Sequence, residues 1–377
     1  MAIPIAEAHL HRSEPYQTSS VRQPQRLRCS VGIMAYNEEA NIARTLQAVL
    51  AQQSTTLDIH EIIIVASGCT DRTIPIVRDF AAHESRVKLY IQEQREGKAS
   101  AINLFLAHVE SEIVVLLGGD IIPAPEALEH LCAPLLDTHI GMVGGRPIPV
   151  NNPHTFMGHV VHLLWHLHDR LAEQAPKLGE IVAFRNVVAG IPIRSAVDEI
   201  SLQALISQLG YQLYYEPYCV VYNKGPLTIK DFLHQRRRIY AGHLQVKEQQ
   251  RYEASTMRAL PIIRQLLATH RYALGTPRRV LWTLGAVVLE SYARLQGYLD
   301  YLYHREHHIW QAVHSSKNPD IDLPQLYASK QEVIARGAFP SGRDQHEKPP
   351  RVVVESLRSE SKPAWTLQFG NCSIKER

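Results

Sequence analysis

The 377-residue sequence lacks several features that mark specialised classes of protein. Its five cysteines are scattered, odd in number and free of any CxxC pair, which argues against a disulfide framework or a zinc ribbon and favours a reducing compartment. A membrane span needs about 20 apolar residues, and the best candidate, residues 280–289, is far shorter. Residues 1–16 contain no apolar stretch of secretory length. These absences predict a cytoplasmic protein with no signal peptide and no transmembrane helix.

Positive and negative charges nearly balance over the whole chain, which has 40 Lys and Arg and 37 Asp and Glu. The charges are unevenly distributed, because residues 224–279 contain twelve Lys and Arg but only three Asp and Glu. This local excess indicates a region that binds anions. With 45% apolar and 20% charged residues, the composition is that of an ordinary globular enzyme, long enough for two or three domains or one large α/β domain.

Short β-branched runs alternate with helical patterns in the first part of the chain. The predicted strands lie at residues 31–35, 62–66, 87–91, 113–117 and 140–143. Amphipathic helices are expected between them, and the first of these is expected to be capped by Asn37. Because the strands are apolar on both faces, the predicted fold class is α/β, with a mostly parallel sheet flanked by helices.

The second part of the chain is predicted to be mainly helical. Helices are expected at residues 156–171 and 197–209, strands at 211–215 and 219–222 on either side of Pro217, and amphipathic helices over 257–312, broken at Pro261 and around 275–277. The expected domains are a flexible arm (1–28), an α/β domain (29–250), an amphipathic helical segment (251–312) and a polar, disordered tail (313–377).

Three loops that follow predicted strands carry polar and small residues. They are Ala35-Tyr36-Asn37-Glu38-Glu39, Ser67-Gly68-Cys69-Thr70-Asp71 and Gly118-Gly119-Asp120. In a parallel α/β sheet, ligands bind beyond the carboxyl ends of the strands, so these loops are expected to open on one edge. Each loop taken alone is also compatible with a helix cap or a turn. Together, the three indicate a ligand site.

These motifs, in this order, resemble family 2 of the nucleotide-sugar glycosyltransferases, which have the GT-A fold. The resemblance spans about residues 29–247 and rests on five segments: Ala35-Tyr36-Asn37-Glu38 (A-x-N-E), residues 67–71 (D-G-S-T-D with the leading Asp replaced), residues 97–103 (G-K-x-x-A-x-N), Asp198-Glu199-x-x-Leu202 (E-D-x-x-L) and residues 235–239 (Q-x-x-R-W). The resemblance implies transfer of a sugar from a nucleoside-diphosphate donor to a hydroxyl acceptor, either a saccharide or a lipid-linked molecule. It also implies inversion by direct displacement, with a carboxylate as base.

A metal site is implied by the same resemblance. The family binds a divalent metal with an Asp-x-Asp motif, in which Gly118 replaces the first Asp here and Asp120 remains. Mg²⁺ often uses one or two carboxylates, with water and substrate phosphates completing its shell, so Asp120 is the expected ligand of Mg²⁺ or Mn²⁺. The residues expected to bind the nucleotide sugar are Ala35, Tyr36, Asn37, Glu38, Ser67, Asp71, Lys98, Asn103, Gly119 and Asp120.

The catalytic base is expected in the acidic pair that begins the helix at 197–209. By resemblance Glu199 is the first candidate and Asp198 the second, although two solvated acids at a helix N-terminus are the alternative. Gln235, Arg236 and Arg238 are expected to face the donor pyrophosphate or an anionic acceptor, with a solvated basic helix as the alternative.

Two helical segments are each compatible with two interpretations. His162 and His166 have the spacing of a shared metal site, but without HExxH or a supporting Cys an acceptor-facing or surface helix is favoured. The aromatic and basic residues of 278–298 fit either an interfacial helix on an anionic membrane or a helix packed on the catalytic domain.

Two other classes of function compete with the glycosyltransferase. One is a non-catalytic nucleotide-sugar or membrane-binding protein, because Ala66 and Gly118 stand where the family has acids. The other is a nucleotidylyltransferase, which is disfavoured because no Walker A motif and no Gly-rich phosphate loop follow the first strand. No nucleic-acid partner is expected.

Overall fold

The computed structural model describes residues 26–269 and 276–305. In these residues one eight-stranded sheet has the strand order β3-β2-β1-β4-β7-β6-β8-β5. The strands are β1 (Leu27–Ala35), β2 (Leu57–Ser67), β3 (Val87–Gln92), β4 (Ile113–Gly118), β5 (Ile122–Pro123), β6 (Ile140–Pro149), β7 (Ile181–Arg185) and β8 (Gln212–Asn223). The pairs β1–β2, β2–β3, β1–β4 and β6–β8 are parallel, and the pairs that involve β7 or β5 are antiparallel. The expected mostly parallel α/β sheet is confirmed.

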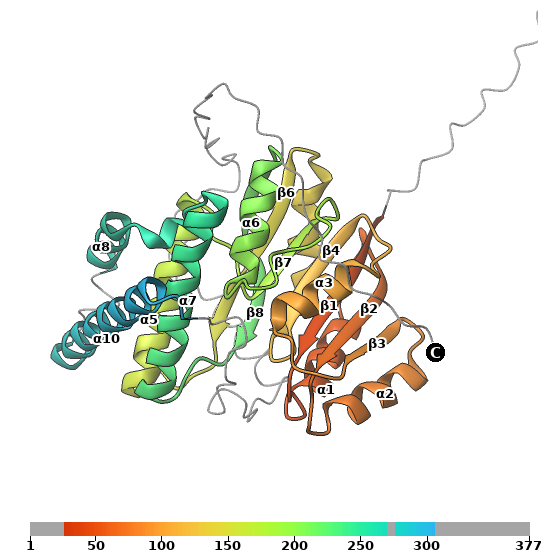
Figure 1. Cartoon of the computed structure of the whole chain (residues 1–377), viewed down its shortest axis with the longest axis horizontal. Coiled ribbons are helices and arrows are strands. Elements are labelled where there is room, and N and C mark those ends of the chain that lie inside the picture. Colours follow the sequence, from red (N-terminus) through yellow and green to blue (C-terminus); the bar gives the residue numbers. More distant parts are fainter. Residues whose placement is uncertain (1–25, 270–275, 306–377) are drawn as a thin grey trace, which may run out of the picture. The chain divides into compact units, whose positions relative to one another are not determined.

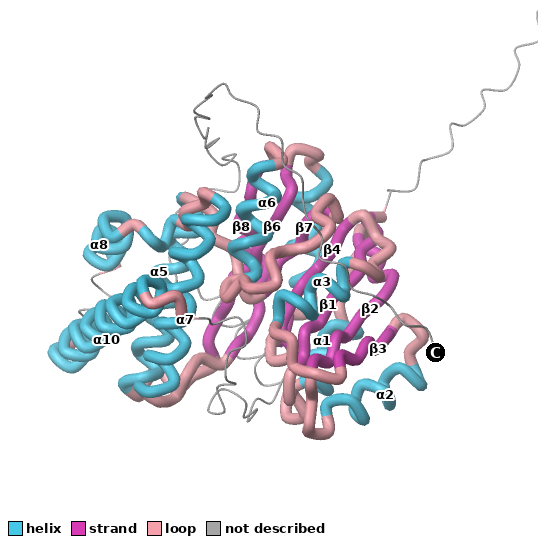
Figure 2. Tube along the Cα trace, viewed as in Figure 1, coloured by secondary structure: helices cyan, strands magenta, loops and turns pink. Residues whose placement is uncertain are grey.

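Helices cover the sheet on both faces (Figures 1 and 2). They are α1 (Ile42–Leu50), α2 (Thr73–His83), α3 (Lys98–Leu106), α4 (Ala127–Cys132), α5 (Phe156–Gln174), α6 (Asp198–Gln208), α7 (Ile229–Gln250), α8 (Ala259–Ala268) and α10 (Pro277–Leu302), with 3-10 turns at Ala133–Leu136 and Ser255–Met257. Ile62 and Ile64 of β2 pack into the core beneath α1, α2 and α4, whereas Ile63 and Val65 pack into the core beneath α3 and α6. The alternation of side chains along a strand therefore explains why β2 is apolar throughout.

The helices α5, α7, α8 and α10 lie together beside the β6–β8 end of the sheet (Figure 1). Helix α10 packs closely on α7, since a Cβ atom on Gly297 would lie 2.5 Å from the backbone oxygen of Arg237. The Arg237 guanidinium forms an ion pair with Asp300 across the same contact. The expectation of a helix packed on the catalytic domain therefore holds for one face of α10. No described helix has the length and apolarity needed to cross a membrane.

Several expected boundaries are wrong. Strand β1 begins at Leu27, inside the expected arm, because its first residues pair with β2. Helix α1 begins at Ile42, and Asn37 does not cap it, since its backbone has φ of 52° and its side chain contacts the next loop.

The second part of the chain contains further differences. Pro217 does not separate two strands, because a shift in the β6–β8 register opposite Gly144–Arg146 accommodates it within β8. Pro261 does not break a helix, because it lies in the first turn of α8, where a missing N–H is tolerated. Strands β5 and β7 were not anticipated. Residues 1–25 of the expected arm and the expected tail, 313–377, lie outside the described residues.

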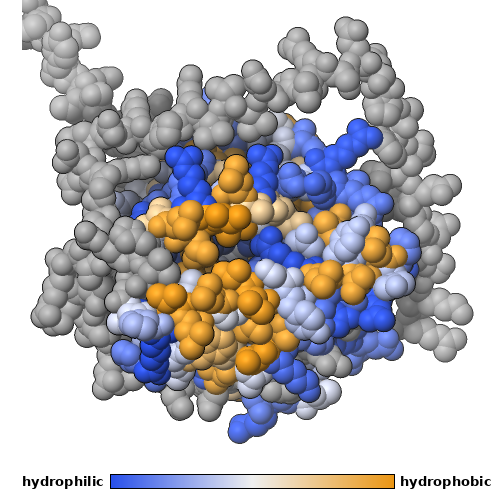
Figure 3. All heavy atoms as spheres, turned by 90° about the vertical axis from the view of Figure 1, so that its left-hand side faces the viewer, coloured by the Kyte–Doolittle hydropathy of each residue, from blue (hydrophilic) through white to orange (hydrophobic). Residues whose placement is uncertain are grey.

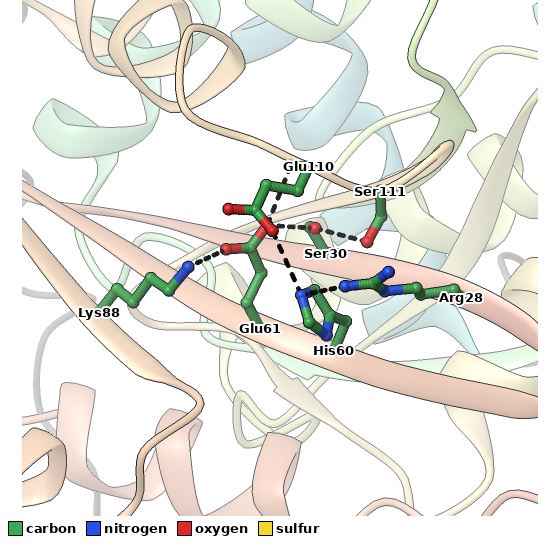
Figure 4. A network of polar contacts seen from close by, with 7 residues as sticks. All are labelled: Arg28, Ser30, His60, Glu61, Lys88, Glu110 and Ser111. Atoms are coloured by element: carbon green, nitrogen blue, oxygen red, sulfur yellow. Dashed lines mark hydrogen bonds and ion pairs between the residues drawn. The ribbon is translucent and has the colours of Figure 1, made fainter.

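A polar network centred on the buried Glu61 lies where β1 and β2 pair (Figure 4). The Glu61 carboxylate is 1% exposed and accepts hydrogen bonds from Ser30 Oγ at 2.6 Å, Lys88 Nζ at 2.8 Å and the backbone N–H of Glu110 at 3.1 Å. Burial acts to raise the pKa of Glu61, but the hydrogen bonds from Lys88 and Ser30 outweigh it and lower the pKa. The carboxylate is therefore ionised in the folded protein.

We expect Glu61→Gln to destabilise the fold by about 1–3 kcal/mol at pH 7, because it removes a charged hydrogen-bond acceptor from a buried network. The folded-state pKa of Glu61 lies below the ordinary value of 4.5, so the network's contribution is present above about pH 4.5 and is lost as the pH falls through the folded-state pKa. Urea unfolding between pH 7 and pH 3 measures this difference. The exposed Glu126→Gln is the control, and a wild-type-to-Glu61→Gln difference that stays constant down to pH 3 would contradict the assignment.

Candidate functional site

A cavity of about 650 Å³ lies at the carboxyl ends of β1, β2 and β4. Ala35, Ser67 and Gly118, the last residues of these three strands, all line it. Its far wall is formed by side chains from α5, α7, α8 and α10. The cavity thus occupies the edge of a parallel sheet at which ligands bind in this class of fold.

Most of the residues predicted from sequence line this cavity. They are Ala35, Tyr36, Glu38, Ser67, Lys98, Gly119, Asp120, Asp198, Glu199, Gln235, Arg236 and Arg238. They come from three strand ends and from the N-terminal turns of α3 and α6, together with α7. Residues that are distant in the sequence therefore meet in one place, which the loop pattern alone could only indicate.

Asn37, Asp71 and Asn103 are not among the residues that line the cavity. The Asn37 side-chain oxygen accepts a hydrogen bond from the backbone N–H of Thr70 at 2.8 Å, which joins two loops, and Asp71 accepts hydrogen bonds from the first turn of α2. The Asn103 side chain contacts the backbone N–H and C=O of Ile191 at 2.8 and 2.9 Å. In this structure the three side chains position the loops around the cavity.

An ion pair joins two of the predicted residues inside the cavity. Lys98 is the first residue of α3 and Glu199 lies in the first turn of α6, and Lys98 Nζ donates to Glu199 Oε1 at 2.5 Å. Burial disfavours both charges, but their mutual attraction outweighs it, raising the pKa of Lys98 and lowering that of Glu199 to about 2. Glu199 is therefore ionised at neutral pH.

Two further acids in the cavity have raised pKa values. Burial and the negative charge of Glu199 raise the pKa of Asp198 to about 7, and Asp198 Oδ1 is buried without a hydrogen-bond partner among the described residues. Burial, Asp120 and Glu199 raise the pKa of Glu180 to about 7. Groups that titrate near neutrality cluster at functional sites, so this part of the cavity is suited to proton transfer or cation binding.

The surroundings of Asp120 fit a divalent cation held partly by a ligand. Asp120 lines the cavity, and its charge acts on Glu180, so two carboxylates face the same region. Gly118 leaves room for Asp120, because a Cβ atom at position 118 would lie 2.7 Å from Asp120 Oδ1. The described residues contain no group of three or more His, Cys, Asp or Glu that could hold a metal by itself. A cation bound there needs further oxygen ligands from a substrate, and substrate phosphates commonly supply such ligands to Mg²⁺.

Two of the basic residues of α7, Arg236 and Arg238, line the cavity, whereas Lys230 and Lys247 of the same helix are exposed. Arg236 donates to Glu290 of α10 at 2.7 and 2.8 Å, and Arg294 donates to the same carboxylate at 2.8 Å. Burial acts to raise the pKa of Glu290, but the two guanidinium groups lower it to about 2. Arg238 donates to the backbone oxygen of Ala196, just before α6.

Sequence reasoning missed several residues of the cavity. Lys177 and Glu180 line it from the loop before β7, and His243 lines it from α7. No motif or spacing marks them in the sequence. His168 and Trp165 also line it, so part of α5 faces the cavity, whereas His162 and His166 are not among the lining residues.

Removing the carboxylate that Arg236 and Arg294 share should destabilise the protein. A fully buried pair broken on one side costs about 3–5 kcal/mol, and because these side chains are 16–26% exposed we expect about 2–3 kcal/mol for Glu290→Gln. Urea unfolding at pH 7 measures this cost. Glu253→Gln, which breaks a more exposed ion pair with Lys247, is the matched control and should cost about 0–1 kcal/mol. Equal costs for the two variants would argue against a role of Glu290 in holding α10 on α7.

Residues 30–199 match the family profile described as Glycosyl transferase family 2. The chain is 30% identical over 117 residues to glycosyltransferase AglE from Haloferax volcanii, and 26% identical over 230 residues to the probable glycosyltransferase YdaM from Bacillus subtilis. These alignments cover 31% and 57% of this chain. They cover 38% and 54% of the two relatives, so the chain spans about half or less of the length of these curated relatives.

The fold is similar to that of the mannosyltransferase PcManGT from Pyrobaculum calidifontis, whose structure was solved in complex with GDP-Man and Mn²⁺. The TM-score is 0.53 and the identity 22%, and the superposition covers 75% of this chain and 90% of that chain. At this level of identity the likeness establishes the fold, which is of the GT-A type.

Proposed function

We propose that the protein transfers a glycosyl group from a nucleoside-diphosphate sugar to a hydroxyl acceptor, in keeping with the match of residues 30–199 to glycosyl transferase family 2. The observation that carries the proposal is the convergence of Lys98, Asp120, Asp198 and Glu199 in one cavity at the carboxyl ends of the parallel strands. Transfer from such a donor needs positive charge near a departing diphosphate and a base near the acceptor, and this cavity offers groups of both kinds.

The nucleoside of the donor is assigned to the loops after β1 and β2. Tyr36, Glu38 and Ser67 line the cavity there, and the Arg95 guanidinium lies 3.7 Å from the centre of the Tyr36 ring. The backbone of Gly119 lies close to this region, since a Cβ atom on it would be 2.9 Å from Glu38 Cγ. An aromatic ring beside hydrogen-bonding groups suits a base and its ribose.

The diphosphate is assigned to the region between Lys98 and Asp120. Asp120, with Glu180 beside it, would hold Mg²⁺ or Mn²⁺ together with the donor's phosphates, and the bound cation would neutralise the charge of the leaving diphosphate. Lys98 adds a fixed positive charge at the N-terminus of α3, where the helix dipole also favours anions.

Glu199 is proposed as the base that accepts the proton of the acceptor hydroxyl. Its carboxylate is ionised because Lys98 lies against it, so it can accept a proton. The same contact lowers the pKa of Glu199 and therefore makes it a weak base. Donor phosphates that approach Lys98 would share its positive charge and so strengthen the base. The new glycosidic bond would form on the face of the sugar opposite the leaving diphosphate, with inversion.

Replacement of Glu199 tests the chemistry. We expect Glu199→Gln to lower kcat by about 10²- to 10⁴-fold, the usual contribution of a general base. Donor affinity should change little, because the amide keeps the shape of the side chain. The measurement is sugar transfer or donor hydrolysis under saturating donor. Asp198→Asn is the matched variant, and a large loss there with little loss in Glu199→Gln would reassign the base to Asp198.

A panel of nucleotide sugars tests the function itself. We expect one donor to raise the Tm of the wild-type protein in the presence of Mn²⁺ or Mg²⁺, because a ligand that binds the native state stabilises it. Asp120→Ala should lose the metal-dependent part of this stabilisation, and the exposed Asp79→Ala should keep it. Stabilisation by no donor would overturn the proposal. Donor binding without transfer or hydrolysis would favour a non-catalytic nucleotide-sugar-binding protein.

A further inference from the structure

The cavity has an apolar half that the donor does not need. Beyond Lys98 and Asp120, and beside the ion-paired groups of α7 and α10, its wall includes aliphatic side chains from α5, α8 and α10, among them Leu167, Ile262 and Leu266. A nucleotide, a diphosphate and a sugar are polar, so none of these parts accounts for a hydrocarbon-lined wall.

The apolar half of the cavity reaches the surface. Ile263 and Val287 line the cavity and are still 52% and 43% exposed. Around them, α8 and α10 present further exposed aliphatic side chains, namely Leu260, Leu267, Leu284 and Val288. Figure 3 faces this end of the molecule and shows hydrophobic side chains gathered in groups around a hollow. The exposed patch is therefore continuous with the interior of the cavity, which a flat docking surface would not require.

A cationic group lies in the cavity together with these apolar side chains. No carboxylate of the described residues lies within ion-pair distance of the Lys177 ammonium, although Glu180 and Glu199 act on it from farther away. His168 is only 7% exposed, and neither of its ring nitrogens makes a well-formed hydrogen bond to any described residue, although the backbone of Lys177 lies nearby. Buried polar groups are normally satisfied, so these atoms indicate a polar ligand.

We propose that the acceptor is a saccharide joined to a long-chain lipid through phosphate. Its hydrocarbon chain lies in the apolar half of the cavity and leaves between α8 and α10, and its phosphate lies against Lys177 and His168. Its sugar hydroxyl then reaches Glu199. This inference rests on the proposed function and names the class of acceptor for it.

Transfer to this acceptor forms one bond and breaks another. The hydroxyl oxygen of the lipid-linked saccharide forms the new bond to the anomeric carbon of the donor sugar. The bond from that carbon to the diphosphate breaks, and its electron pair leaves on the nucleoside diphosphate. The hydroxyl proton passes to Glu199.

Binding of short probes to the full-length protein tests the proposal. The probes are dodecyl phosphate, dodecanol and inorganic phosphate, each kept below the concentration at which micelles form, with Kd measured by calorimetry. We expect dodecyl phosphate to bind the wild-type protein at least about tenfold more tightly than either other probe, because it combines apolar burial with a charge-assisted contact. Lys177→Met should weaken dodecyl phosphate about tenfold and leave dodecanol unchanged.

Variants of the apolar half complete the test. Ile263→Asp and Val287→Asp should each weaken both alkyl probes about tenfold or more, because they place a charge beside the hydrocarbon chain. Leu136→Asp, at a site 61% exposed and outside the cavity lining, is the matched control and should bind as the wild type does. Equal binding of the probes by Ile263→Asp and Leu136→Asp would overturn the proposal.

Other occupants of the patch give different results. Binding to anionic vesicles without binding of monomeric dodecyl phosphate would assign the patch to a membrane surface and overturn the proposal. A dimer of the wild-type protein that Ile263→Asp dissociates, without binding of the alkyl probes, would assign the patch to a second copy of the chain and would also overturn the proposal.

Donor-induced stabilisation distinguishes failure of the acceptor class from failure of the proposed function. If a donor stabilises the wild type but dodecyl phosphate does not bind, the acceptor class alone fails, whereas absence of donor binding contradicts the proposed function.

Discussion

The parallel pairing of β1 with both β2 and β4 is the constraint on which the site depends. Ala35 is paired with Ala66, and Met34 with Gly118, so three strands end at nearly the same level. The loops that follow them must then open on one edge, whatever their sequences. The apolar side chains of both strand faces stabilise this register, because a slip by one residue would turn every side chain of a strand to the opposite face. The polar site is thus positioned by the two apolar clusters that cover the faces of the sheet.

The charges of the cavity are arranged so that each buried ion has a partner or a neighbour of opposite sign. Lys98 offsets Glu199, and Glu290 offsets two guanidinium groups at the far wall. Isolated buried charges would be neutralised by shifts in pKa, and this is what happens to the acids with less compensation, Asp198 and Glu180, whose pKa values rise to about 7. The same cavity therefore contains both an acid that stays ionised and acids that titrate near neutrality. Such a division is the pattern expected where protons are moved.

The sequence predicted the parts of the fold that depend on local pattern. Strands β1 to β4 and the loops after them follow from β-branched runs and from polar residues at their ends, and the acidic pair at the start of α6 follows from its motif. What could not be predicted depends on long-range packing. Lys177 and Glu180 carry no motif, and they reach the cavity because β7 runs antiparallel between β4 and β6. Asn37 was expected to cap a helix, but a hydrogen bond to Thr70 in the neighbouring loop holds it in another conformation. At these positions around the site, local rules failed because tertiary contacts outweigh them.

Helix α10 connects the stability of the cavity to the character of its opening. On one side, Glu290 and Gly297 hold the helix closely against α7, so the far wall of the cavity exists only while these contacts persist. On the other side, residues such as Val288 remain 66% exposed, although burial of apolar surface stabilises a protein by about 25 cal/mol per Å². Within the described residues, the packing of α10 therefore satisfies its charged groups and leaves part of its apolar surface without a partner. Since exposed apolar patches of this kind mark sites of interaction, the exposed face of α10 is better understood as part of a binding site than as incomplete packing.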